Sequence, residues 1–314
     1  MRIGSDHQKH ALRESADEHV TLEVTGPDQH NGEDASSVVV VGCGYESTDG
    51  AREAGLSWAG ILQRAFACLN IGADLGGRRK SDGWTSRLRE TQAADNEDQQ
   101  QAAEILAGMK LLYDQPGLML FEDDPWPTFA RRTSFGWAGQ SPSILVDAVA
   151  AVRRAAAPLS PMEQTAYELY SSSFSAVSSD ARFVVLMMAL ETLIEPQPRD
   201  AAVVAHVNAL IEQTRRSDLP ENEVTSLMGS LEYMRRESIR QAGRRLVRVL
   251  GSRQYMNLAA DKFFTTCYTL RSRLVHGEHP RPSREEIDSH TPGLERLVSD
   301  LLAGNLRDDS VPSR

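Results

Sequence analysis

Residues 259–280 read AADKFFTTCYTLRSRLVHGEHP, from Ala259 to Pro280. The apolar positions in this stretch recur at steps of three and four, which predicts an amphipathic helix over residues 259–275; they are Phe263, Phe264, Cys267, Tyr268, Leu270, Leu274 and Val275. We expect the helix to end abruptly, because Gly277 can adopt the left-handed conformation that closes a helix and Pro280 cannot continue one.

This predicted end places His276 in the last helical turn, where unpaired carbonyls and the negative end of the helix dipole favour a cation. Arg271 precedes His276 by five residues, so the two side chains project about 140° apart around the helix axis. One helix therefore offers a permanent cation and a side chain that exchanges protons near neutral pH. A second copy related by a two-fold axis would bring two such pairs to one cleft.

Three segments of the C-terminal half resemble the HEPN superfamily, and its Apea-like branch in particular. Arg271-Ser-Arg-Leu-Val-His276 fits the superfamily's Arg-x(4–6)-His motif, within the longer match Tyr268–Glu278. Arg182–Glu195 and Ser238–Val247 match in the expected order. The resemblance implies an all-helical domain that pairs with itself and, in many members, cleaves RNA without a metal ion.

Carried onto this sequence, the resemblance implies that Arg271 and His276 are the catalytic pair. Active toxins of the superfamily often have Asn, Asp or His after the arginine, whereas this chain has Ser272. With the local charge described below, the expected RNA-binding residues are Ser272, Arg273, Arg244, Arg245 and Arg248. Family context suggests phage defence or a toxin role, with a homodimer as the working unit.

Charge is divided unevenly along the chain, whose formal net charge is −10. Residues 1–140 carry 13 basic and 22 acidic side chains, a net −9, while residues 231–281 carry 11 basic and 4 acidic ones, a net +7. A local positive charge of this kind attracts a phosphate backbone. The alternative interpretation is a solvated helix face in which arginine serves solubility.

Composition predicts an intracellular, cytoplasmic protein with about two domains. The 314 residues include 40% hydrophobic ones, enough for a sizeable core. We find neither a signal-peptide core nor an apolar run of the ~18 residues that a membrane span needs, and therefore expect no membrane partner. The three cysteines suit a reducing compartment.

No metal or cofactor is expected. His7, His10 and His19 lack cysteine or carboxylate partners at a fixed spacing, and the spacing of His276, Glu278 and His279 is poor for a metal site.

The N-terminal part, residues 1–140, is predicted to be a small α+β sensor or regulatory domain. Residues 1 to about 17 are expected to be a loose end, followed by strands at Val20–Val24 and Val38–Cys43 and a helix over residues 51–70 that covers the sheet. A phage-derived or cellular trigger would act on this domain.

An apolar strand that runs into Gly42-Cys-Gly44 also invites a dinucleotide-binding interpretation. That fingerprint needs a third small residue where this chain has Ser47, and it needs a helix where Glu46–Gly50 suggests a loop.

The C-terminal part, residues 141–314, is predicted to be an HEPN-like helical bundle. Together with the small N-terminal α+β domain, it gives the whole chain an α+β fold class. Phe183–Ile194 is apolar nearly all round, which indicates a helix at the centre of its domain or in a dimer interface. Glu191 within it needs a partner, and we expect a salt bridge to an arginine of the final helices. A last helix is expected at Thr291–Leu302.

Three functional hypotheses follow from these patterns. The first is a metal-independent endoribonuclease that acts as a homodimer, since the 2′-hydroxyl of RNA is itself a nucleophile beside the scissile phosphate. The second is a non-catalytic module that binds RNA or a protein through the same helical surface. The third places a nucleotide-dependent activity on the N-terminal sheet.

Overall fold

The structure is a computed structural model that describes residues 9–14, 19–25, 37–75, 111–114, 118, 120, 128–131, 142–155, 159–277, 279–304 and 306. The chain forms two compact units, Met1–Ser160 with Asn305–Arg314, and Pro161–Gly304. The described part is mostly helical, with a small antiparallel sheet near the N-terminus, so the α+β class is confirmed in this sense. Within it, no helix has both the length and the apolar content for crossing a bilayer.

The N-terminal sheet has three antiparallel strands in the order β1 (Lys9–Glu14), β2 (His19–Thr25) and β3 (Ser37–Cys43). The last two confirm the expected strands, and Val20 of β2 is fully buried. The expectation of a loose end over residues 1–17 is wrong in part, because β1 pairs with β2 along its whole length. Residues 1–8 and 15–18 lie outside the described residues.

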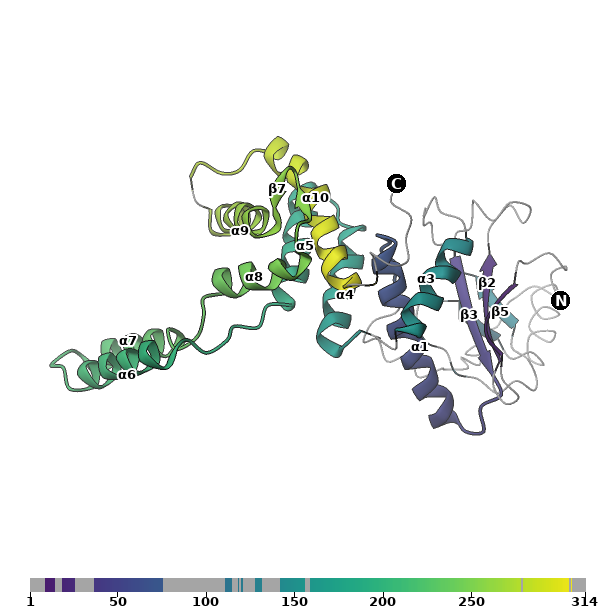
Figure 1. Cartoon of the computed structure of the whole chain (residues 1–314), viewed down its shortest axis with the longest axis horizontal. Coiled ribbons are helices and arrows are strands. Elements are labelled where there is room, and N and C mark those ends of the chain that lie inside the picture. Colours follow the sequence, from purple (N-terminus) through teal and green to yellow (C-terminus); the bar gives the residue numbers. More distant parts are fainter. Residues whose placement is uncertain are drawn as a thin grey trace, which may run out of the picture. The chain divides into compact units, whose positions relative to one another are not determined.

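Helix α1 (Thr48–Cys68) covers this sheet, as expected (Figure 1). It begins earlier than the sequence suggested: Ser47 is its N-cap, and the Ser47 hydroxyl accepts a hydrogen bond of 3.1 Å from the Gly50 amide. The loop interpretation of residues 46–50 is therefore wrong for residues 48–50, while residues 46 and 47 precede the helix and Ser47 satisfies an amide at its start. The antiparallel pairing of β2 with β3 nevertheless differs from the parallel βαβ unit of a dinucleotide site.

A second helix, α3 (Pro142–Arg154), packs on α1 and contacts β1, so it belongs to the N-terminal unit. The guanidinium of Arg153 lies 5.1 Å from the ring centre of Trp58 in α1, and it donates a hydrogen bond to the carbonyl of Leu12 in β1. These contacts explain why the units divide at Pro161, whereas the sequence placed the boundary after residue 140. A short parallel pair, β4 (Leu111–Asp114) and β5 (Thr128–Arg131), completes the described part of this unit.

The C-terminal unit is built around α5 (Ser179–Thr192), which packs against α4, α9 and α10. Phe183, Leu186 and Leu190 of α5 are fully buried, so its predicted central position within the domain is confirmed. The three packing partners are α4 (Pro161–Ser173), α9 (Ala260–His276) and α10 (Arg284–Ala303).

The last helix is longer than expected. The Ser283 hydroxyl caps it by accepting a 3.1 Å bond from the Glu286 amide, so α10 starts well before residue 291.

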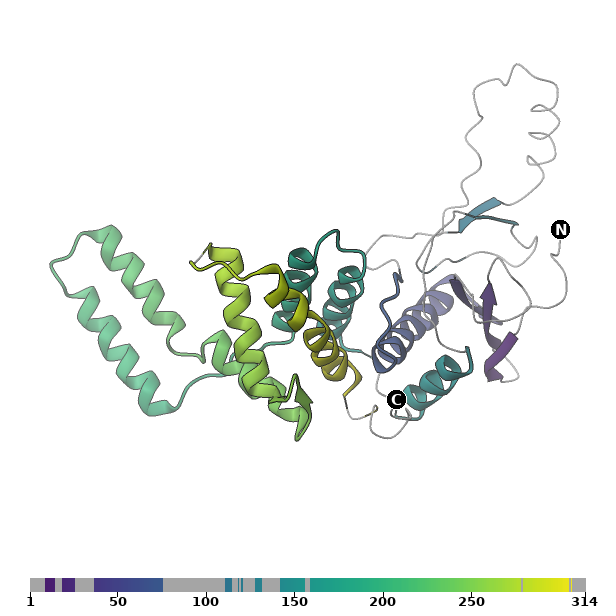
Figure 2. The ribbon, with the colours of Figure 1, turned by 90° about the horizontal axis from the view of Figure 1, so that it is seen from above.

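Helices α6 (Ala201–Arg215) and α7 (Glu221–Tyr233) form a hairpin that packs mainly on itself and extends from the rest of the C-terminal unit (Figure 2). Only Val207 and Ile211 of α6 are buried, and α7 buries no residue completely. The two stems of the hairpin are joined at its base by an antiparallel bridge between Pro198 and Arg236.

Helix α8 (Ile239–Val247) packs closely on α9, and a single turn of 3₁₀-helix, η2 (Arg248–Leu250), extends it. A two-stranded hairpin, β6 (Gln254–Tyr255) and β7 (Leu258–Ala259), then leads into α9. Gly243 permits the close approach of α8 and α9. A Cβ atom at this position would lie 2.2 Å from Cζ of Phe264 and 2.9 Å from Cδ1 of Ile194.

We expect Gly243→Ala to lower the free energy of unfolding of the C-terminal unit by about 1–3 kcal/mol, because the added methyl group overpacks the core. Gly229→Ala in α7 is the matched control, since nothing lies within 4 Å of its added Cβ. This control should gain about 0.5–1 kcal/mol from helix propensity. Urea unfolding followed by circular dichroism measures both changes, and equal shifts for the two variants would contradict the packing argument.

Candidate functional site

His276 occupies the last turn of α9, as the sequence predicted, and its side chain is exposed. Gly277 closes the helix in the left-handed conformation, with φ of 68° and ψ of 26°, and its amide donates to the carbonyl of Arg273. The predicted helix stop is therefore confirmed. Because the imidazole is exposed, a bound ligand can reach it.

Arg271 forms an ion pair with Glu191 of α5, with 3.2 Å between Nη2 and Oε2. This pair confirms the expected salt bridge between Glu191 and an arginine of the final helices. The two side chains are 24% and 22% exposed, so the pair lies at the edge of the core rather than in open solvent. Nε of Arg271 and Oε1 of Glu191 are buried without a hydrogen-bond partner, so the contact is made through one atom of each group.

Burial raises the pKa of Glu191 above the ordinary value of a glutamate, and the positive charge of Arg271 offsets only part of this increase. Because the folded state then holds the proton more tightly than the unfolded state, ionisation of Glu191 weakens the fold as the pH rises from the ordinary pKa through the raised one. The carboxylate thus orients Arg271 at some cost in stability.

We expect Glu191→Ala to lower the free energy of unfolding by about 1–3 kcal/mol, because it leaves a half-buried guanidinium without its counter-charge. This figure is below the ~3–5 kcal/mol for a fully buried pair because both side chains reach solvent. The double variant Glu191→Leu/Arg271→Met removes both charges, so its free energy of unfolding should fall by less than that of Glu191→Ala. Urea unfolding tests this order, and a double variant less stable than the single one would contradict the pairing.

Ser272 and Arg273 follow Arg271 on α9, and both are partly buried. Arg273 donates through Nε to the carbonyl of Pro280 at 3.0 Å, and its Nη1 lies 3.7 Å from Oε1 of Glu286 in α10. It therefore fastens the segment after α9 to the next helix. This structural task accounts for Arg273, which the sequence assigned to RNA binding.

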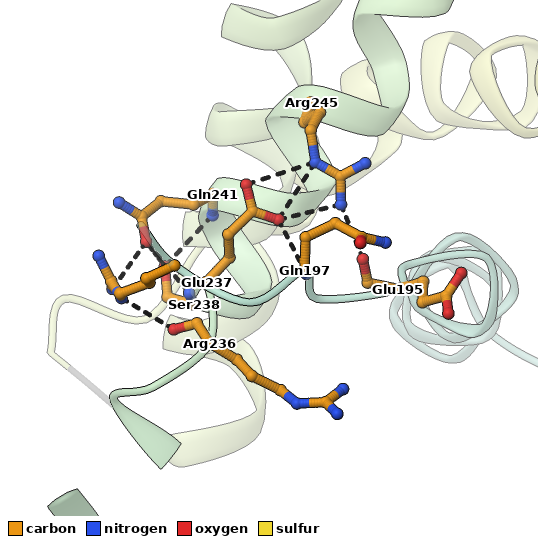
Figure 3. Close-up of polar contacts among 8 residues, drawn as sticks. Glu195, Gln197, Arg236, Glu237, Ser238, Gln241 and Arg245 are labelled. Atoms are coloured by element: carbon orange, nitrogen blue, oxygen red, sulfur yellow. Dashed lines mark hydrogen bonds and ion pairs between the residues drawn. The ribbon is translucent and has the colours of Figure 1, made fainter. Parts of the chain in front are cut away.

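Arg245 points into a polar cluster at the base of the α6–α7 hairpin (Figure 3). Its guanidinium donates to Glu237, with Nη2 2.9 Å from Oε2, and to the Glu195 carbonyl at 2.7 Å. Glu237 also accepts from the amide of Gln197 at 3.1 Å. These hydrogen bonds hold the pKa of Glu237 below its usual value, the Arg245 contact having the largest effect. Arg245 therefore links α8 to the hairpin stem.

Arg244 and Arg248 reach a different place, the start of α9, where both approach Asp261. Their Nη2 atoms lie 3.4 Å and 3.7 Å from Oδ2 of this residue. Asp261 precedes Arg271 by ten residues, which corresponds to about 15 Å along an α-helix. The structure thus brings Arg271, Ser272, Arg273 and His276 together on the last turns of α9 and places Arg244 and Arg248 towards its other end.

Much of the positive charge in residues 231–281 is balanced by carboxylates. Within the part of the chain that the structure describes, ion pairs join Arg235 to Glu232, Arg244 and Arg248 to Asp261, Arg245 to Glu237, Arg253 to Asp300, Arg271 to Glu191, Arg273 to Glu286 and Arg281 to Asp180. In the same residues, no group of three or more His, Cys, Asp or Glu side chains is arranged to hold a metal ion.

We compared the chain with protein-family models, curated proteins and solved structures. No protein-family model matches the chain, and no curated protein or solved structure matches it significantly.

Proposed function

We propose that the protein is a metal-independent endoribonuclease of the HEPN type that works as a homodimer, with His276 as the proton-transfer residue and Arg271 as the phosphate ligand. The observation that carries this proposal is the end of α9, where an exposed imidazole follows a guanidinium held by Glu191. The resemblance of three C-terminal segments to that superfamily supports the same assignment. Phage defence or a toxin role would fit such an activity.

The chemistry needs only the two kinds of group that this helix end supplies, a proton carrier and a guanidinium. The 2′-oxygen of a ribose attacks the adjacent phosphorus, its proton passes to a base, and the bond from phosphorus to the 5′-oxygen breaks as that oxygen gains a proton. The products are a 2′,3′-cyclic phosphate and a 5′-hydroxyl end. Arg271 would stabilise the extra negative charge on the phosphorane through its guanidinium.

The requirement for two proton transfers favours a dimer. The last turn of α9 carries a single histidine, so a partner's His276 related by a two-fold axis provides the second proton carrier. The N-terminal unit would then act as the sensor or regulator.

Cleavage of single-stranded RNA in EDTA tests the proposal directly. We expect the purified protein to cut in the presence of the chelator and to leave 2′,3′-cyclic phosphate ends, detected by mass spectrometry of the products. Mass photometry should show a dimer under the same conditions. Cleavage that needs a divalent cation, or products with 3′-hydroxyl ends, would exclude this mechanism.

A second candidate, a non-catalytic binding module, is favoured by two observations. Arg271 is already engaged by Glu191, and Ser272 follows it in place of the charged or amide side chain found in active toxins. RNA binding that weakens steeply with salt, without any cleavage, would support this candidate.

A further inference from the structure

Three arginines lie at intervals of four residues along α8 and η2: Arg240, Arg244 and Arg248. Residues four apart share one face of a helix and are separated by about 6 Å along its axis. All three point towards α9, because Arg240 donates to the Thr269 hydroxyl at 3.0 Å while the other two reach Asp261. We call these three residues the arginine ladder. It excludes Arg245, whose side chain lies on another face of α8, at the hairpin base.

The ladder retains an excess of positive charge. The ladder holds three cations and one carboxylate, and the exposed Lys262 follows Asp261 in the sequence of α9. Among the residues that the structure describes, neither Arg240 nor Lys262 forms an ion pair. The side chains of Arg244 and Arg248 are 47% and 63% exposed although they share Asp261. The carboxylate therefore steadies two guanidiniums without neutralising the face.

We propose that the arginine ladder binds the phosphate backbone of single-stranded RNA. This inference rests on the proposed function for the identity of the ligand, and it assigns substrate binding to a surface away from Arg271 and His276. A row of guanidiniums at regular one-turn intervals suits an anionic polymer, since each can form two hydrogen bonds with a phosphate. The hydroxyl of Thr269, which accepts from Arg240, adds a further polar group on α9.

The residue types of this face favour nucleic acid over a protein partner. Protein interfaces are centred on buried aromatic or aliphatic anchors. The ladder and its contacts on α9 are arginine, threonine and a single aspartate, and the exposed aliphatic side chains of Ile239 and Val249 occupy other positions of α8 and η2. Contacts of this kind bind the sugar-phosphate chain and not the bases, so they contribute affinity without sequence preference.

The test uses fluorescence anisotropy with a labelled 2′-O-methyl RNA, whose blocked 2′-oxygen prevents cleavage, in EDTA over a range of KCl concentrations. The variant is Arg240→Gln/Arg244→Gln. The control, Arg216→Gln/Arg236→Gln, removes the same charge from exposed side chains of the α6–α7 hairpin region. Each phosphate contact contributes about −0.7 to the slope of log K against log salt for a single strand, so the ladder variant should lose about 1.4 units of slope and about tenfold or more in affinity near 0.1 M salt.

Asp261→Asn gives a change in the opposite direction. It removes the carboxylate that competes with phosphate for Arg244 and Arg248, so RNA should bind several-fold more tightly. A merely structural role for these residues predicts no gain in affinity.

Equal losses in the ladder and control variants would overturn the proposal, as would a wild-type protein that does not bind RNA at low salt. Polyglutamate serves as a competitor in the same assay. Two results together would make the RNA proposal wrong: polyglutamate displaces RNA from the control variant, and the ladder variant keeps the wild-type slope of log K against log salt for RNA. In that case the ladder binds an acidic protein segment. Binding is measured without cleavage, so the two proposals can fail separately. If the wild-type protein binds RNA with the expected salt dependence but does not cleave it, the ribonuclease proposal is wrong and the ladder proposal stands.

Discussion

Replacing His276 by alanine is expected to lower the rate of RNA cleavage by about 10²- to 10⁴-fold, which is the usual contribution of a positioned general acid or base. The fold should be unaffected, because the imidazole is exposed and its interaction with the helix end contributes only about 0.3–1 kcal/mol. Cleavage is measured in EDTA with RNA in excess, so the loss appears in the maximal rate. Binding of the 2′-O-methyl RNA should remain close to that of the wild type.

The matched control for this change is His206→Ala in α6, which removes another exposed histidine from the same unit. We expect it to cleave at the wild-type rate. Far-UV circular dichroism and mass photometry check that both variants keep their helices and their oligomeric state. If His276→Ala cuts RNA as fast as His206→Ala, the proton-transfer role is wrong and the binding-module candidate replaces it.

Local chemistry allowed the sequence to predict where α9 ends and that Glu191 pairs with an arginine. A glycine three residues before a proline determines where a helix must stop, and a carboxylate in an apolar helix must find a cation. The identity of Arg271 as that cation depends on how α5 packs against α9, which is a tertiary property. The same limit applies to Ser283, whose spacing from Glu286 is a capping-box pattern that becomes decisive only in the folded helix.

Other elements lacked a readable signal. Strand β1 is polar, and only its pairing with β2 defines it. The β6–β7 hairpin turns through Met256 and Asn257, both with positive φ, of 50° and 61°. Methionine rarely adopts this conformation, so the usual Asn-Gly pattern is absent.

The faces on which the arginines of α8 lie could have been predicted from their spacing in the sequence. Residues one apart project about 100° from each other on a helix, so Arg244 and Arg245 had to serve different faces, and Arg240 had to join the former.

The second large effect concerns a buried polar network that joins the β6–β7 hairpin to α10. The Tyr255 hydroxyl donates to Oδ2 of Asp300 at 2.6 Å, and Nη1 of Arg253 lies 3.6 Å from the same oxygen. Both Tyr255 and Asp300 are 2% exposed. Burial and the neighbouring carboxylate raise the pKa of Tyr255 well above its usual value, so the phenol stays protonated and donates. The Tyr255 ring also stacks on Phe263 of α9.

Asp300→Ala should therefore lower the free energy of unfolding of the C-terminal unit by about 3–5 kcal/mol, because it leaves a buried phenol and a partly buried guanidinium without their acceptor. Asp300→Asn keeps an acceptor oxygen and should lower the free energy of unfolding by less. Asp288→Ala on the same helix is the control: its side chain is 48% exposed in a surface pair with Arg284, so the change should stay within about 0.5 kcal/mol.

The distribution of tryptophan makes the measurement specific to one unit. All four tryptophans precede Pro161, at positions 58, 84, 126 and 137, whereas most of the described helix belongs to the C-terminal unit. In urea, Asp300→Ala should shift the transition seen by far-UV circular dichroism and leave the tryptophan fluorescence transition in place. Equal stability of Asp300→Ala and Asp288→Ala would show that the network contributes no net stability. A loss of this size would instead show that Asp300 anchors the hairpin from which α9 begins, and with it the helix that carries Arg271 and His276.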